Sequence, residues 1–228
     1  MYLRPAVLPK AHFRFAPAIS CPAFSVSPGY GNLQGMGRNV RNLTLSSLLA
    51  AVTAALSLVA VPLPYSPVPL TGQTFGVMLS GLALGPWWGA LSMLVYLAIG
   101  CLGFPVFAGG GTGIGTLLGP TGGYLVGFVL GAWATGMSMR VATNRTEARG
   151  PGKGRRPQLR TYIIASVLGG VAVVHTVGAF WLARYSGRTG AEAFTLGSAP
   201  FLPGDLLKAV VACLVASRLE ATGLRWSR

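Results

Sequence analysis

The chain has very few acidic side chains and a long stretch with no charge. Only 4 of its 228 residues are Asp or Glu, against 18 Lys or Arg, and charged residues make up 10% of the total, where a soluble domain has about 25%. From residue 42 to residue 139 there is no Asp, Glu, Lys, Arg or His. Because a water-soluble fold needs charge on its surface, the sequence predicts an all-α, polytopic membrane protein.

The sequence also lacks patterns typical of metal sites and catalytic centres. All four acids follow residue 146, and the 3 cysteines and 2 histidines have no ligand spacing. The glycine-rich stretches "AGGGTGIG" and "GPGKGRR" do not have the order of a phosphate-binding loop. We therefore expect no metal, no cofactor, no nucleotide site and no catalytic residue.

The net charge of +14 would suit a nucleic-acid-binding protein if the basic residues formed one face. They lie instead in the two ends of the chain and in one loop, residues 140–160. This placement is typical of topological signals and of contacts with anionic headgroups. Membrane lipids are thus expected partners, and nucleic acid is not.

Six apolar segments are long enough to cross about 30 Å of hydrocarbon. They lie at about 44–62, 70–85, 87–104, 122–139, 161–183 and 201–217. The second and third meet at "GP", residues 85 and 86, which predicts a tight helical hairpin. The expected architecture is a six-transmembrane-helix bundle.

The basic residues predict the orientation and the domain boundaries. With six spans, the basic residues before the first span, in the loop 140–160 and after the last span fall on one side, which is then cytoplasmic. Both termini would face the cytoplasm at the plasma membrane. We expect a disordered extension at 1–40, a membrane domain at 41–218 and a basic tail at 219–228. The extension is either transit-like or the product of an upstream start, with Met36 as the true first residue.

The segment "FLPGDLLKAVVACLVA", residues 201–216, carries two charges in an apolar run. Pro203 and Gly204 suit a helix start, so Asp205 would lie in the first turn and Lys208 on the same face. The pair is either a ligand site, which we favour because intramembrane charge marks substrate paths, or a structural ion pair. His175, mid-span, is interpreted as a neutral side chain bonded to a neighbouring helix.

Two uncharged loops face the opposite side. Residues 61–73, "VPLPYSPVPLTGQ", hold four prolines that prevent helix formation, and residues 104–124 hold eight glycines. The glycines favour a close approach of the backbone to a ligand or a neighbouring helix, and the alternative is a loop that only packs.

The first span presents small residues at four-residue spacing on two adjoining faces. They are Ser46, Ala50 and Ala54 on one face and Ser47, Ala51 and Ala55 on the other. Small residues let helices approach closely, so these faces either pack inside the bundle or dock another membrane protein.

Three motifs occur together with the six spans: "VPLTGQT", "GPTGGYLVGF" and "PFLPGDLLKA". Over about residues 43–217 the chain thereby resembles BioY, the biotin-binding S-component of energy-coupling-factor (ECF) transporters. The resemblance implies a subunit that captures biotin with high affinity, with uptake driven by a separate module of two ATPases and a transmembrane coupling subunit. It places the family's Asp and Lys at Asp205 and Lys208. It places the docking alanines at Ala50 and Ala54 or at Ala51 and Ala55.

With this resemblance, the expected substrate-binding residues are Asp205, Lys208, Tyr124, Thr112, Gln73, Phe107 and Tyr65. The resemblance implies a polar residue such as Asn in the glycine-rich loop; this sequence has "GGGTG" there, so either Thr112 or backbone groups would fill that role. Aromatic side chains, Phe104 included, would cover the apolar part of biotin, and Lys208, Arg184 or Arg188 would meet its carboxylate. Two alternatives remain open: a stand-alone facilitator or channel for a small neutral solute, and an intramembrane enzyme with His175 and Asp205 as an acid–base pair.

Overall fold

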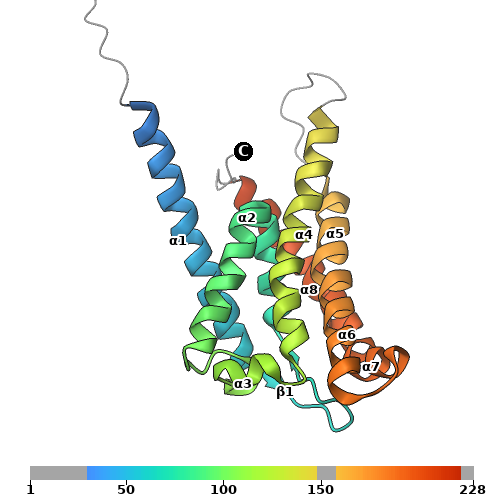
Figure 1. Cartoon of the computed structure of the whole chain (residues 1–228). Coiled ribbons are helices and arrows are strands. Elements are labelled where there is room, and N and C mark those ends of the chain that lie inside the picture. Colours follow the sequence, from blue (N-terminus) through green and yellow to red (C-terminus); the bar gives the residue numbers. More distant parts are fainter. Residues whose placement is uncertain (1–29, 148–157, 222–228) are drawn as a thin grey trace, which may run out of the picture.

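The computed structural model describes residues 30–147 and 158–221, and this part of the chain is an α-helical bundle (Figure 1). The long elements are α1 (Tyr30–Leu58), α2 (Gln73–Cys101), α4 (Gly122–Glu147), α5 (Leu159–Ser166), α6 (Val174–Ser186) and α8 (Leu202–Ala221). A π-helical segment, Val167–Val173, makes α5 and α6 one continuous rod. The short elements are α3 (Gly113–Leu118), α7 (Gly190–Gly197), two 3-10 turns (Ala108–Gly110 and Ala199–Phe201) and the antiparallel strands β1 (Ala60–Val61) and β2 (Leu70–Thr71).

The element α2 consists of two antiparallel limbs. At Gly85, φ is 77° and ψ is −174°, a conformation that favours glycine, and Pro86 follows. A Cβ added to Gly89 would lie 3.1 Å from the Cα of Gly81, whereas residues eight apart on a straight helix are separated by about 12 Å. The predicted hairpin is therefore present. Five helical stretches of the described chain are long and apolar enough to span a membrane, and one of them is this hairpin, so the predicted six-helix bundle is confirmed.

Three segments differ from the expectation. Residues 30–40 were expected to be disordered but form the start of α1, because no proline lies between Pro28 and Pro62 to stop the helix. The loop 184–200 contains α7, which begins with a capping box between Thr189 and Glu192. The glycine-rich loop contains α3. Residues 1–29, residues 148–157 of the basic loop and residues 222–228 of the basic tail lie outside the described residues.

The two faces of α1 that carry small residues have different environments. Ser46 and Ala50 are buried, and Ser46 Oγ donates to the carbonyl of Trp88 at 3.1 Å, so this face packs on the second limb of α2. Ala54 is partly buried against the core. Ala51 and Ala55 are exposed. Of the two faces, only that of Ala51 and Ala55 is left exposed by the bundle.

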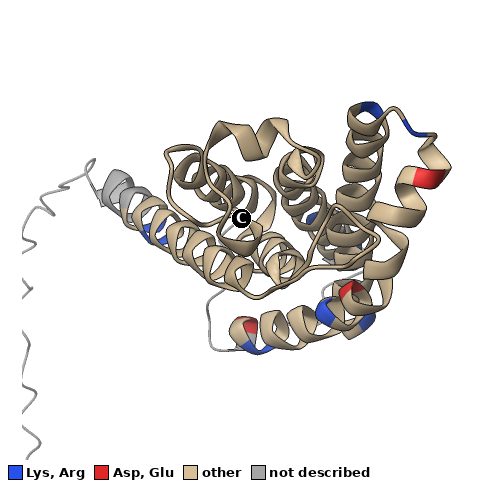
Figure 2. Ribbon diagram, turned by 90° about the horizontal axis from the view of Figure 1, so that it is seen from below, with Lys and Arg blue, Asp and Glu red and all other residues tan. Residues whose placement is uncertain are grey.

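The charged residues are distributed as the membrane interpretation requires. The start of α1, the end of α4 and the end of α8 lie at the same end of the bundle (Figure 1). The described residues of the three basic clusters are carried by the ends of the helices on this side. Viewed along the bundle, the central helices carry almost no charged residues (Figure 2).

Gly136 offers a test of the hairpin. A Cβ at this position would lie 2.4 Å from the backbone C of Gly85 and the backbone N of Pro86, which have no room to move. We expect Gly136→Ala to destabilise the protein by about 1–3 kcal/mol, the usual cost of overpacking. Gly115→Ala is the matched control, because a Cβ there meets nothing within 4 Å. Thermal unfolding in detergent compares the two, and equal melting temperatures would contradict the packing of α4 on this turn.

Candidate functional site

A cavity of about 260 Å³ lies at the end of the bundle opposite the basic clusters. Its walls come from the β1–β2 connection and from the starts of α2, α4 and α8, together with α6 and the glycine-rich loop. The lining residues are Pro67, Val68, Pro69, Leu70, Thr71, Gln73, Thr74, Phe107, Ala108, Thr116, Thr121, Tyr124, Leu125, Phe128, Val174, His175, Phe201, Asp205 and Lys208. The wall is therefore mainly apolar, with its charged groups confined to one side.

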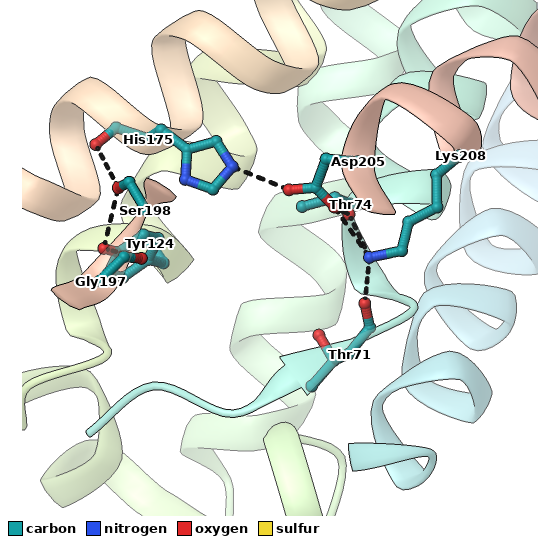
Figure 3. A network of polar contacts seen from close by, with 8 residues as sticks. All are labelled: Thr71, Thr74, Tyr124, His175, Gly197, Ser198, Asp205 and Lys208. Atoms are coloured by element: carbon teal, nitrogen blue, oxygen red, sulfur yellow. Dashed lines mark hydrogen bonds and ion pairs between the residues drawn. The ribbon is translucent and has the colours of Figure 1, made fainter. Parts of the chain in front are cut away.

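Asp205 lies in the first turn of α8, as the sequence predicts, and only 2% of it is exposed. Its Oδ1 accepts hydrogen bonds from Thr74 Oγ1 at 2.7 Å and from Lys208 Nζ at 2.8 Å. Its Oδ2 lies 2.8 Å from His175 Nε2. Figure 3 shows the carboxylate between these side chains, which come from α2, α6 and α8. A buried carboxylate with three partners is firmly oriented.

Lys208 connects α8 to strand β2. Its Nζ donates to the carbonyl of Thr71 at 2.5 Å and to Asp205 at 2.8 Å, and it lies 3.3 Å from Thr74 Oγ1 (Figure 3). The side chain is 22% exposed. Since the ammonium group has three donors, the longer contact with Thr74 is the one that a ligand oxygen can replace most easily.

His175 bonds to a neighbouring helix as predicted, and it also lines the cavity, a role that we did not predict. The π-helical segment ends directly before α6, which begins at Val174, so His175 lies in the first turn of α6. Lys208 and Asp205 already cancel each other's charge. Because the carboxylate of Asp205 only accepts hydrogen bonds, His175 donates to it from Nε2. The sequence offered one signal, an ionisable residue in mid-span.

Tyr124, Gln73 and Phe107 also line the cavity, as the sequence predicts. The hydroxyl of Tyr124 donates to the carbonyl of Gly197 at 2.6 Å, so its ring is held against the cavity. Gln73 donates to the hydroxyl of Tyr96, which in turn donates to the carbonyl of Val106 at 2.9 Å. Phe107 is fully buried edge-to-face on Tyr96, and these contacts anchor the glycine-rich loop over the cavity.

Two predicted residues do not reach the cavity. Tyr65 is 58% exposed and does not line it. Thr112 is exposed before α3, because the turn after Phe107 directs the chain outward. One helical turn later, Thr116 faces back and lines the cavity, with its hydroxyl bonded to the carbonyl of Thr112 at 2.9 Å. Residue type alone does not distinguish the two threonines.

The structure also reduces the number of candidates for the cation that would meet a ligand carboxylate. Arg184 and Arg188 are exposed and lie outside the cavity wall, as does Phe104. Among the lining residues, Lys208 alone carries a permanent positive charge. The arrangement can hold a ligand that has an apolar body, hydrogen-bonding groups at one side and a group that a cation attracts.

Comparison with known proteins shows that the sequence of this chain matches a known family. A sequence model described as the BioY family matches residues 27–224. The biotin transporter BioY of Rhizobium etli is 37% identical over 178 residues, which are 78% of this chain and 91% of that protein. The biotin transporter BioY of Rhodobacter capsulatus is 40% identical over 185 residues, 77% of this chain and 91% of that protein.

A solved structure agrees with these relatives. The crystal structure of the S-component for biotin from an ECF-type ABC transporter has a TM-score of 0.71 and 30% sequence identity, and the match covers 81% of this chain and 93% of that one. Sequence and fold therefore agree over most of the chain: it belongs to the BioY family.

Proposed function

We propose that this protein captures biotin from outside the cell as the substrate-binding subunit of an ECF-type transporter. The observation that carries the proposal is the polar cluster of Asp205, Lys208 and His175 on one side of a mainly apolar cavity. The names of the relatives and the solved S-component for biotin support the same substrate.

The chemistry of biotin suits this cavity. Its ureido group has two N–H donors and one strong acceptor, and it is neutral. The carboxylate of Asp205 has about four acceptor positions, of which three are occupied, so one remains for a ligand N–H. Lys208 supplies a donor for a ligand oxygen. Phe107, Phe128 and Phe201 supply apolar surface for the thiophane ring and the valeryl chain.

The same proposal includes partners and an orientation. The exposed face of Ala51 and Ala55 would dock the transmembrane coupling subunit of an energising module with two ATPases. The end of the bundle that carries the three basic clusters would face the cytoplasm, with both termini on that side. The cavity would then open toward the outside, where biotin is captured.

Two other functions are less well supported. A stand-alone facilitator would move a solute across the membrane without any ATPase. The solved structure that this chain resembles is a component of an ABC transporter, which does not favour a protein that works alone. In an enzyme, His175 and Asp205 would have to act on a substrate, but their facing atoms are already bonded to each other at 2.8 Å. The family and the geometry both favour binding.

The purified protein should bind biotin in the absence of nucleotide and metal. Isothermal titration calorimetry in detergent measures this, with thiamine as the control ligand. We expect saturable heat with biotin and none with thiamine, because the polar cluster suits a neutral ureido group beside an anionic tail. Tight binding of thiamine without any response to biotin would refute the proposed substrate.

A further inference from the structure

A second hollow, of about 390 Å³, lies between α4 and α5 near the basic end of the bundle. Its lining residues are Met137, Ser138, Val141, Ala142 and Arg145 on α4, and Thr161, Ile164, Ala165 and Leu168 on the rod formed by α5 and the π-helical segment. On each helix these residues recur at intervals of three or four, so one face of each helix forms a wall. We call this hollow the α4–α5 groove.

The α4–α5 groove faces the surroundings of the bundle. Val141, Ile164 and Leu168 are 43%, 57% and 52% exposed, while Ala165, at 1%, lies in its floor. In a bilayer there is no water at this depth, so hydrocarbon must fill an apolar groove. From Met137 to Arg145 the groove runs about 12 Å along α4, close to the roughly 15 Å that one leaflet contributes to the hydrocarbon core. One acyl chain from the leaflet at the basic end fits this length.

The end of the groove nearest the α4–α5 connection is basic. Arg145 lies there on α4 and Thr161 on α5, and both line the groove. Among the side chains that the structure describes, Arg145 has no acidic partner. Arg140 and Arg160 are exposed at the same end. Over residues 140–160 the sequence carries seven Lys or Arg and a single acid, Glu147. This end therefore attracts an anion at the level of the headgroups.

We propose that the α4–α5 groove binds one anionic phospholipid. The phosphate contacts the guanidinium of Arg145, the hydroxyl of Thr161 donates to a phosphate or glycerol oxygen, and one acyl chain lies along the groove. The guanidinium fork suits a phosphate group, and the surrounding basic residues favour a headgroup with net negative charge over a zwitterionic one. The inference does not depend on the identity of the transported substrate.

Native mass spectrometry of the full chain tests this site. Detergent-solubilised protein is mixed with equimolar phosphatidylglycerol and phosphatidylcholine, and retained lipid is counted. We expect one phosphatidylglycerol in preference to phosphatidylcholine. Arg145→Gln should lower its retention about fivefold, the contribution of one Arg at a membrane surface. Leu168→Trp should lower retention as well, because it fills the groove and leaves every charge in place.

Arg218→Gln is the matched control, since Arg218 is exposed at the same end of the bundle but does not line the groove. It should keep the lipid. Equal loss in the Arg218 and Arg145 variants would show diffuse attraction and overturn the site. Full retention in the Leu168 variant, or displacement of the lipid by inorganic phosphate, would overturn the acyl-chain part. Biotin binding should be unchanged in all three variants, so a failure here stays distinct from a failure of the proposed transport function.

Discussion

Asp205→Asn is expected to weaken biotin binding by about 1.5–3 kcal/mol, the range for a hydrogen bond with a charged group, or about ten- to a hundredfold in Kd. The side chain keeps its shape, but its amide nitrogen cannot accept the bonds that one carboxylate oxygen now receives. Lys208, which lies 2.8 Å from the carboxylate, also loses its counter-ion. Glu192→Gln is the control, because this acid is exposed on α7 and does not line the cavity.

A double-mutant cycle separates a ligand site from a structural ion pair. Lys208→Met keeps the apolar stem and removes the ammonium, so it leaves the carboxylate of Asp205 without its charged partner. If both groups serve the ligand as one unit, the double variant should lose less binding energy than the sum of the single losses. Calorimetry and thermal unfolding are measured on all four proteins. Wild-type affinity in a well-folded double variant would assign the pair to the scaffold and not to the site.

Ala51→Trp is expected to leave biotin binding unchanged and to lower uptake about tenfold or more in cells that contain the energising module. A tenfold decrease corresponds to only about 1.4 kcal/mol of docking free energy. Ala51 is exposed on α1, and the bulk of Trp would hold a second helix away from a face that small residues keep flat. Ala55→Trp should act in the same way.

Two controls define this docking surface. Leu214→Trp changes an exposed position on α8, away from the face of Ala51 and Ala55, and should leave uptake intact. Ala50→Trp changes a side chain that is 1% exposed and should destabilise the bundle itself. Normal uptake with Ala51→Trp would exclude this face as the contact with the coupling subunit. Loss of biotin binding together with uptake would show instead that the face belongs to the interior.

The sequence alone determined the features that depend on neighbouring residues. The absence of charge from 42 to 139 identifies a membrane protein, because composition along the chain is enough to show apolar spans. The Gly85–Pro86 pair identifies the hairpin, because a turn depends on adjacent residues. The contact between Asp205 and Lys208 was predictable as well, because residues that are three positions apart on a helix lie on the same face. The three motifs indicate the family without any tertiary contact, because each is a short run of adjacent residues.

Only the tertiary structure decided which distant residues meet. Thr74 bonds to Asp205 across 131 positions and His175 across 30, and helix packing alone sets such distances. The choice of Thr116 over Thr112 depends on a turn in a glycine-rich loop, where many backbone conformations are open to the sequence. The register of the alanine faces depends on which side of α1 packs on α2. Small residues suit either side, so burial against a neighbouring helix, which periodicity does not encode, separates Ala50 from Ala51.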